Sequence, residues 1–383
     1  MKMILSLARV LREIRNYFSN KLRIEAWLLD GREKHSGEPF TVAYAGGLER
    51  HRIYFANLAF GPGWGERSLG REWLWRVKSR AERENHACAL LVYETGVEKE
   101  ALFTGSNLLR SPVWLKFEIP VEEKDLSRTA RLRRRDMERK IRKHSFTSSS
   151  SRKEEDFDNF YHNMYVPYIQ NRHGEMSAIQ EYSLMKKEFL SGGELVFIHK
   201  DGLRIAGGVV DHSQKNSRFH CLGILDGSQE YARMGVSDAL YCFQLKHIRE
   251  RGGMTANLGH CRAFFGDGVF RYKVEIGARV GGGYYRPNGL LRFMPLKRTA
   301  ALMSYWLNNP FVAQGKEGQY HGIIFIDRVP PVGELDKILD ANFCRGVDHV
   351  TIYTLDGSTS DPVRTSSGHN IRFAAAASLL KGK

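Results

Sequence analysis

The stretch of residues 254–287 constrains the fold more than any other segment, because its elements follow one another in a readable order. Residues 254–261 mix apolar and small side chains and predict a short strand. Asp267 can cap a helix by accepting hydrogen bonds from N–H groups two or three residues further on, and Gly277 stands where a left-handed helix stop is expected. Residues 278–286 are rich in Gly and Tyr and predict a closing strand. A loop with His and Arg joins the first strand to the helix, so the stretch predicts a functional site.

Length and composition limit the class of protein. A chain of 383 residues predicts two or three domains, each able to bury a core. With 42% apolar and 26% charged residues, a folded globular protein is expected rather than a disordered one. No window reaches the roughly 18 uninterrupted apolar residues of a membrane helix.

The cysteines are five in number, widely spaced and without a CxxC pair. This usage argues against a disulfide framework or a structural zinc site and favours a reducing compartment. Arg9, Arg12 and Arg15 interrupt any apolar signal segment at the N-terminus. The sequence therefore predicts a cytoplasmic protein.

The formal net charge is +15, with 58 basic against 43 acidic residues, and such a surface attracts phosphate-bearing partners. Residues 1–24 contain an amphipathic basic helix, which fits either a membrane-surface anchor or a helix docked on the first domain. Residues 126–144 place nine bases against Asp136 and Glu138 on a second amphipathic helix. This helix can contact the phosphates of tRNA, a sugar nucleotide or a membrane, or it can be a solvated connection. The Ser-rich run at 146–153 predicts a flexible joint.

The remaining patterns predict two α/β units and a smaller third one. In the first unit, residues 41–45 and 53–59 predict strands joined by a Gly46-Gly47 turn, and residues 113–119 predict a later strand. The second unit starts near residue 154 and contains aromatic-rich helices, a hairpin, a buried strand and a long helix. Residues 301–383 predict an appendage of strands and one helix.

A glycine marks the turn into the long helix of the second unit, within the sequence Arg233-Met234-Gly235-Val236. At such a turn, backbone N–H groups can approach an anion, and the helix N-terminus adds a positive dipole. The pattern predicts a pyrophosphate cradle, although an ordinary turn glycine would give the same sequence.

Several segments resemble the GNAT acyltransferase fold, and specifically its FemAB-like branch with two such domains in tandem. They are the basic helix ending RKIRK, FDNFYHNMYVPYIQNRHG, the hairpin ELVFIHKDGLRIAGGVV, the loop and helix YARMGVSDALY, and FGDGVFRYKVEIGA. The resemblance covers residues 126–300, the first unit matches only in element order, and the C-terminal part lies outside it. It implies an α/β fold with tandem GNAT-like domains at 25–125 and 151–300, a basic helix and Ser-rich joint at 126–150, and a small α/β appendage at 301–383.

The resemblance implies donor-binding residues in the loop and helix. Arg233, Gly235, Val236 and Ser237 would meet the phosphates of the donor, with Ala232 where this loop usually has Gln or Arg. Lys273, paired with Tyr272, matches the family's Lys and would steady a carbonyl or a phosphate of the donor. Acyl-CoA, acetyl-CoA among them, and aminoacyl-tRNA are the implied donors.

N-acyl transfer needs an amine that loses a proton and an oxyanion that hydrogen-bond donors stabilise. His260 is the candidate base and Tyr284 or Tyr285 the candidate acid, although His260 can equally be a structural histidine. Cys261 is a further candidate nucleophile. His260 and Cys261 lack more ligands at useful spacing, so no metal is expected. The other candidates for substrate binding are Arg172, His173, Arg262 and Tyr272. Arg172 and His173 could hold an acidic acceptor or cap the preceding helix, and Arg262 lies at the mouth of the site.

The leading hypothesis is an N-acyltransferase that moves an acyl group from a CoA thioester to an amine of a cell-envelope, polysaccharide or peptide precursor. A FemAB-like aminoacyltransferase that uses aminoacyl-tRNA is the alternative within the same fold. A different class is a non-catalytic protein that keeps the fold and binds RNA or a membrane surface. No DNA partner is expected.

Overall fold

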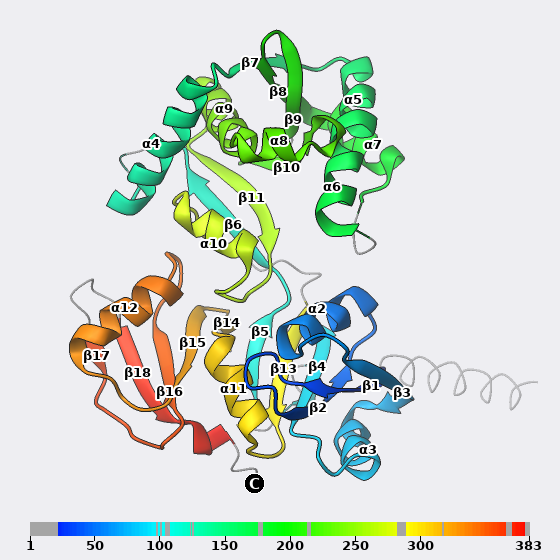
Figure 1. Ribbon diagram of the computed structural model, residues 1–383, viewed down its shortest axis with the longest axis vertical. Helices are drawn as coiled ribbons and strands as arrows, with labels where there is room; N and C mark the ends of the chain where they lie inside the picture. Colours follow the sequence, from blue (N-terminus) through cyan, green and yellow to red (C-terminus); the bar gives the residue numbers. More distant parts are fainter. Residues whose placement is uncertain are drawn as a thin grey trace, which may run out of the picture.

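The computed structural model has three mixed sheets with helices on their faces, which confirms the α/β class (Figure 1). It describes residues 22–96, 99, 102–103, 108–122, 124, 126–174, 179–212, 216–281, 289–315, 318–364 and 370–379. The basic helix expected at the N-terminus falls almost wholly outside these residues, and Tyr284 and Tyr285 fall outside them as well.

The first sheet is built mainly from the N-terminal part of the chain. Its six strands run in the order β3 (Gly65–Trp73), β1 (Arg23–Arg32), β2 (Pro39–Ala45), β4 (Leu90–Gly96), β13 (Gly289–Pro295) and β5 (Leu109–Pro112). Helices α2 (Glu49–Ala59) and α3 (Val77–Glu84) lie between β2 and β4 in the sequence. Phe55 and Ala56 of α2 share one buried cluster with Val42 and Tyr44 of β2, so this helix covers a face of the sheet.

The second sheet forms the upper lobe in Figure 1. Its seven strands run in the order β12 (Arg279–Val280), β6 (Leu115–Pro120), β11 (Thr255–Cys261), β10 (Ser217–Ile224), β9 (Leu203–Asp211), β8 (Gly193–Lys200) and β7 (Thr147–Ser151). The helices of this lobe are α4 (Arg128–Lys143), α5 (Glu154–Phe160), α6 (Val166–His173), α7 (Tyr182–Gly192), α8 (Gln229–Arg233), α9 (Val236–Glu250) and α10 (Gly268–Glu275), and a π-helical turn (Tyr161–Tyr165) joins α5 to α6.

The third sheet belongs to the C-terminal part. Its strands are β14 (Phe311–Gln314), β15 (Tyr320–Ile326), β16 (Val350–Thr354), β18 (Asn370–Ala375) and β17 (Val363–Arg364), with helix α12 (Val332–Asn342). Helix α11 (Ala300–Asn308) lies between this sheet and the first one. Its Tyr305 ring lies 6.1 Å from Phe40 and its Trp306 ring stacks 4.5 Å from Phe325. The C-terminal part therefore shares a core with the first sheet instead of hanging from it as an appendage.

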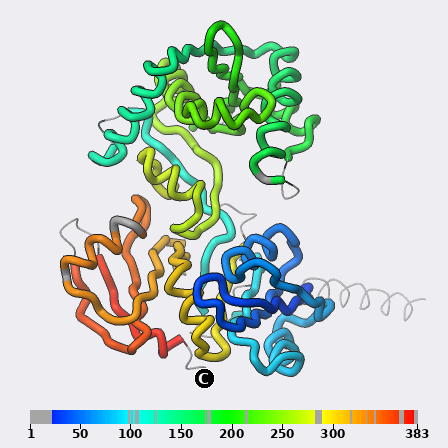
Figure 2. Tube along the Cα trace, viewed as in Figure 1, coloured from blue at the N-terminus to red at the C-terminus, as the bar shows by residue number. Residues whose placement is uncertain are grey.

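The two larger sheets exchange one strand each. In the first sheet the parallel pair β2 and β4 is followed by β13 and then β5; in the second, the parallel pair β10 and β11 is followed by β6 and then β12. Figure 2 shows the chain crossing from one lobe to the other at β6. Strand β6 comes from before the boundary expected at 125, and β13 from before the one expected at 300, so these boundaries do not follow the sheets. The matching order gives the tandem architecture a physical basis.

Two further expectations about elements are wrong. Residues 53–59 lie in α2, where the buried residues His51, Arg52, Phe55, Ala56 and Ala59 recur at helical spacing. A short apolar run such as this one cannot be assigned to a helix or a strand from periodicity alone. The Ser-rich run forms the edge strand β7, which pairs antiparallel with β8, so it is an ordered part of the sheet.

Candidate active site

The carboxyl ends of β10 and β11 organise the candidate site. The two parallel strands pair only at Ser217↔Ala256 and Arg218↔Asn257, although β10 continues to Ile224 and β11 to Cys261. The register of β10 against β9 also shifts between Phe219 and Cys221. In open α/β sheets, ligands bind beyond the carboxyl ends of parallel strands. The predicted site residues that follow lie at this end of the sheet.

The predicted phosphate loop lies at the start of α9. Gly235 is the N-cap residue and has a φ of +84°, a left-handed conformation that favours glycine. Arg233 is exposed, Ser237 is half-buried, and the Val236 side chain is fully buried in the core. Val236 can therefore meet a phosphate only through its backbone N–H. The N-terminus of this 15-residue helix is suited to an anion.

Asp238, in the first turn of α9, ties three other side chains to this helix end. Its carboxylate accepts hydrogen bonds from Arg133 at 3.0, 3.2 and 3.3 Å and from Lys140 at 2.9 Å, both on α4. The Tyr272 hydroxyl donates to the same carboxylate at 3.1 Å. Burial and this carboxylate raise the pKa of Tyr272 well above its usual range. Tyr272, expected to bind substrate, therefore has its hydroxyl engaged within the protein.

Lys273 and His260, two predicted site residues, meet at the end of β11. The Lys273 side chain is 2% exposed, and its Nζ donates a hydrogen bond to the backbone oxygen of His260 at 3.0 Å. Burial lowers the pKa of Lys273. Within the described ranges, no carboxylate forms an ion pair with this ammonium group. A buried lysine without a carboxylate partner is costly and is typical of functional sites.

His260 has surroundings that suit a neutral ring. Burial, followed by the positive charges of Lys273, Lys116 and Arg218, lowers its pKa to about 4. The imidazole is therefore uncharged at neutral pH, and it is a weak proton acceptor compared with a histidine near its usual range. The role of base predicted for His260 is untested, and its low pKa makes a positioning or hydrogen-bonding role the better fit.

The four other predicted residues have different surroundings. Arg262 is 9% exposed, and its guanidinium lies 4.4 Å from the Tyr54 ring and 4.0 Å from the Trp114 ring, so it docks the second lobe on the first sheet. Arg172 is exposed and donates to the Tyr168 hydroxyl at 2.5 Å. The His173 side chain lies outside the described part of the chain. Burial raises the pKa of Cys261 to about 12, which leaves it an inert thiol and removes it as a nucleophile.

The sequence interpretation missed a second polar cluster, on the first sheet. His51 of α2 lies against Glu94 at the end of β4, and Tyr44 of β2 donates to the same carboxylate at 2.8 Å. The Gly46-Gly47 dipeptide shortly before α2 was the available signal, because a glycine also stands directly before α9, at Gly235. Assigning residues 53–59 to a strand hid this equivalence.

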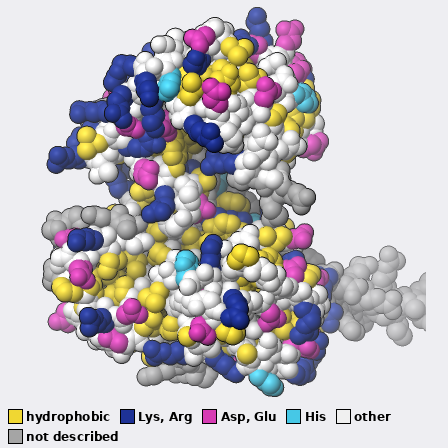
Figure 3. All heavy atoms as spheres, in the orientation of Figure 1, with side chains coloured by type: hydrophobic (Ala, Val, Ile, Leu, Met, Phe, Trp, Pro, Cys, Tyr) yellow, Lys and Arg dark blue, Asp and Glu magenta, His cyan; other side chains and the backbone are white. Residues whose placement is uncertain are grey.

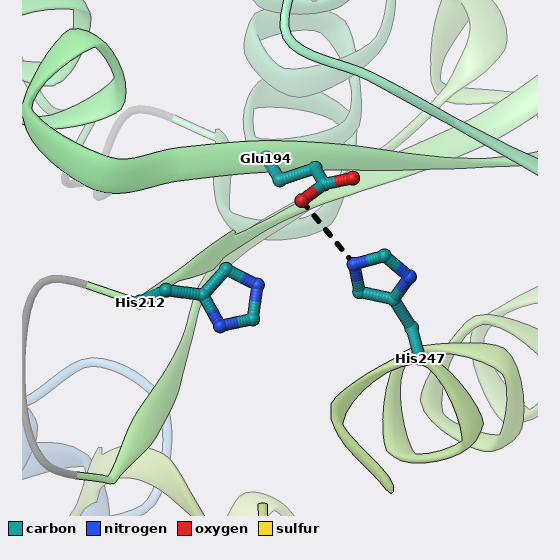
Figure 4. A group of neighbouring side chains, drawn as sticks. All are labelled: Glu194, His212 and His247. Atoms are coloured by element: carbon teal, nitrogen blue, oxygen red, sulfur yellow. Dashed lines mark ion pairs between the residues drawn. The ribbon is translucent and has the colours of Figure 1, made fainter. Parts of the chain in front are cut away.

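Glu194, His212 and His247 were also not foreseen, and their ligand atoms lie within 4.8 Å of one another (Figure 4). This donor set could hold a divalent metal, but the surrounding charges do not favour one. The Glu194 carboxylate already accepts from Arg152 at 2.9 Å and from Arg251 at 3.2 Å, and His247 lies 3.4 Å from it. The arrangement fits a charge-paired network better than a metal centre.

Comparisons with known proteins find only weak similarities to solved structures. No protein-family model matches the sequence, and no curated protein matches it. FemX is similar to this chain, at 13% identity and a TM-score of 0.35 over 69% of this chain and 83% of that one. L-PGS from Bacillus licheniformis is similar at 10% identity and a TM-score of 0.33, over 73% of this chain and 83% of that one. A tandem GNAT protein from the clavulanic acid biosynthesis pathway is similar at 8% identity and a TM-score of 0.30, over 70% of this chain and 82% of that one. All three similarities have a TM-score below 0.5.

The sequence did not predict a membrane-spanning helix. Among the helices that the structure describes, none is long and apolar enough to span a bilayer. The five cysteines are all free.

Proposed function

We propose that this protein is an N-acyltransferase that takes an acyl group from a phosphate-bearing donor at the second sheet and transfers it to an amine. The observation that carries the proposal is the buried ammonium of Lys273, hydrogen-bonded to the carbonyl of His260 at the end of β11 and without a carboxylate partner among the described residues. A donor of this kind at a strand end can stabilise the oxyanion that develops on the acyl carbonyl.

The reaction needs no covalent intermediate on the protein. The amine nitrogen attacks the acyl carbonyl, the carbonyl oxygen gains negative charge, and the bond to the leaving group breaks as the tetrahedral species collapses. Lys273 supplies positive charge to that oxygen in a region of low dielectric, where a charge interaction is stronger than in water. The leaving thiolate or alkoxide then takes up the proton that the attacking nitrogen loses.

For the donor we favour acyl-CoA, with its pyrophosphate at the N-terminus of α9. Arg233 is exposed beside this helix end, and Lys140 lies so close that a Cβ on Gly235 would come within 2.9 Å of its Cδ. These two cations and the free N–H groups of the first helical turn match a pyrophosphate. The acceptor class stays an amine of a cell-envelope, polysaccharide or peptide precursor.

Aminoacyl-tRNA is the second candidate donor, and the outer face of α4 favours it. Of the nine bases on this helix, Arg134 is buried and donates to the backbone oxygens of Pro120 and Val121, while Arg133 and Lys140 bind Asp238. Five more are exposed, namely Arg128, Arg135, Arg139, Arg142 and Lys143. Figure 3 shows Lys and Arg gathered over the part of the upper lobe where α4 lies. Such a stripe is suited to a phosphate backbone or an anionic membrane surface.

Product analysis separates the candidates. The protein is incubated with a panel of primary amines and either acetyl-CoA or aminoacyl-tRNA, and the products are identified by mass spectrometry. Arg233→Ala should weaken CoA binding in calorimetry, whereas Arg135→Ala with Arg142→Ala should weaken tRNA binding and leave CoA binding unchanged. If neither donor gives a product while RNA or anionic vesicles bind with a steep salt dependence, the protein is a binding module and the proposed function is wrong.

A further inference from the structure

A cavity of about 430 Å³ opens at the carboxyl ends of β2 and β4, beside the N-terminus of α2. It occupies, in the first sheet, the position that the candidate donor site has in the second, because β2 and β4 are the parallel pair of their sheet. The lining residues that matter here are Arg50, His51, Glu94 and Trp114. The polar side chains of this lining are held in a fixed arrangement by their neighbours.

His51 and Glu94 form a buried imidazole–carboxylate pair in this lining. The His51 side chain is 5% exposed and that of Glu94 is 8% exposed, and the contact joins Nδ1 of His51 to Oε1 of Glu94. The other ring nitrogen, Nε2, is buried and has no hydrogen-bond partner among the described residues. With Nδ1–H donated to the carboxylate, Nε2 is the ring nitrogen that can accept a proton. This is the geometry of a base that a third group orients.

Two neighbours fix this pair. The Tyr44 hydroxyl donates to the other Glu94 oxygen, Oε2, at 2.8 Å. Gly46 leaves the necessary space, because a Cβ there would lie 2.8 Å from the same oxygen. The Trp114 ring stands edge-on to the His51 ring, 5.8 Å away, and gives the cavity an apolar wall.

The cavity also touches the second lobe. Trp114 contacts the guanidinium of Arg262 at 4.0 Å, and Arg262 follows His260 by two residues. The end of β11, where the His260 carbonyl accepts from Lys273, therefore leads within two residues to a side chain that contacts a wall of the cavity. Arg50, which is exposed, lines the cavity next to the free N–H groups at the start of α2, an environment for an anionic group.

We infer that this cavity binds the acceptor, a primary amine that also carries an anionic group, and that His51 is its proton acceptor. This inference rests on the proposed function. The ammonium of the acceptor gives a proton to Nε2, which makes an imidazolium that the Glu94 carboxylate stabilises. The neutral nitrogen then attacks the acyl carbonyl, the bond to sulfur or oxygen of the donor breaks, and the leaving group is protonated as the second N–H proton is lost.

The first test needs no donor. In protein labelled with ¹⁵N-histidine, the His51 signal is assigned by its loss in His51→Asn, whose amide can keep the contact with Glu94. We expect an imidazole with the proton on Nδ1, and an Nε2 shift that saturates when L-lysine or phosphoethanolamine is added. Acetate and butylamine, which each carry one of the two groups, should shift it at least tenfold more weakly. An Nε2 shift that none of these probes moves would overturn the inference.

The second test uses turnover with the same amines and the donor that proves active. His51→Asn should lower kcat by about 10²-fold or more and remove the rising limb of the pH profile, with donor affinity unchanged. Tyr44→Phe, which removes a hydrogen bond to the same carboxylate, should keep the pH profile. Unchanged kcat in His51→Asn overturns the assignment of the base. If the wild type binds the probes at His51 but transfers nothing from either donor, the proposed function fails and the cavity remains an amine site.

Discussion

The two halves of the molecule place ionisable side chains at matching positions and give them opposite partners. His51 is the third residue of α2 and Asp238 is the third residue of α9, and each helix lies between the two strands of its parallel pair in the sequence. His51 contacts Glu94, on the second strand of its pair. Asp238 instead accepts hydrogen bonds from Arg133 and Lys140 on α4. The histidine of the second half, His260, lies on the strand instead and is left among cations.

The difference indicates that the two halves of the molecule, although similar in strand order, have different roles. The Glu94 carboxylate lies against Nδ1 of His51 and orients the ring, which leaves Nε2 to accept a proton. Cations around His260 favour its neutral form, and the same cations suit a phosphate and a developing oxyanion. The first half thus has the chemistry of an acceptor site and the second half that of a donor site.

The largest expected effect comes from Lys273. Lys273→Met should lower the rate of acyl transfer by about 10²- to 10³-fold, the usual loss when one oxyanion donor is removed. Stability should not fall, because an apolar side chain of similar length replaces a buried ammonium without a carboxylate partner. Single-turnover kinetics and urea unfolding measure the two quantities. Lys246→Met, on the exposed face of α9, is the matched control; a rate loss of the same size there would remove Lys273 from the site.

Gly46 and Gly47 offer a matched pair that tests the first half. A Cβ on Gly46 would lie 2.8 Å from Glu94 Oε2 and from Tyr44 Cε1, whereas one on Gly47 would meet nothing within 4 Å. Gly46→Ala should therefore cost about 1 to 3 kcal/mol in the free energy of unfolding and weaken probe binding at His51. Gly47→Ala should leave both nearly unchanged. Equal costs for the two variants would mean that the turn, and not the position of Glu94, sets the effect.

Asp238 tests whether the corresponding position in the second half is structural. Asp238→Asn removes the charge that Arg133, Lys140 and Tyr272 share, and we expect a loss of about 1.5 kcal/mol in unfolding free energy. Asp136→Asn should cost less, because Asp136 pairs with the exposed Arg139 and lies at the longer distances of 3.6 Å from Arg133 and 3.5 Å from Lys140. A loss of transfer rate in Asp238→Asn greater than its loss of donor affinity would instead give this carboxylate a part in the chemistry.

Local patterns in the sequence were sufficient for the second half. Asp267 accepts from the N–H groups of Val269 and Phe270 at 3.0 Å, and Gly277 has a φ of +97°, so the helix cap and stop predicted from two residues are confirmed. Gly235 likewise has the left-handed backbone that a turn into a helix requires. Each of these features depends on neighbours within a few residues, which is why sequence alone could give them.

The strand exchange and the His51 pair could not be found in this way. Strand β13 pairs with β4 across nearly two hundred residues of intervening chain, and Glu94 is 43 residues from His51. No periodicity in the sequence links such segments, because their contact depends on which strand pairs with the open edge of each sheet. Once α2 had been assigned to a strand, His51 also had no reason to face the end of β4. The local geometry around the candidate donor residues was therefore predictable, and the contact between His51 and Glu94 was not.

The pH dependence of stability sharpens the contrast between the histidines. His260 has a folded pKa of about 4, below that of an unfolded histidine at about 6.5. Between these values the unfolded chain binds a proton that the folded chain refuses, so stability is complete above pH 6.5 and falls as the pH drops to 4. His260→Gln should flatten this part of the profile in urea unfolding, and so should His321→Gln, because burial also lowers the pKa of His321 to about 4. A profile as steep as that of the wild type in His260→Gln would contradict the cationic surroundings.

The smallest expected effect concerns Glu194, the carboxylate that stands beside His247 as Glu94 stands beside His51. Burial acts to raise the pKa of Glu194. Hydrogen bonds from Arg152 and the charge of His247 outweigh burial and keep this pKa below its ordinary value. Two guanidinium groups already pair with the Glu194 carboxylate, and this weakens its attraction for a divalent metal ion. Addition of Zn²⁺ should therefore shift the melting temperature by less than about 1 °C, because ligand binding stabilises only in proportion to its occupancy. A larger rise that His212→Asn removes would show a metal site, and Glu194 would then be a ligand instead of the counter-ion of Arg152 and Arg251.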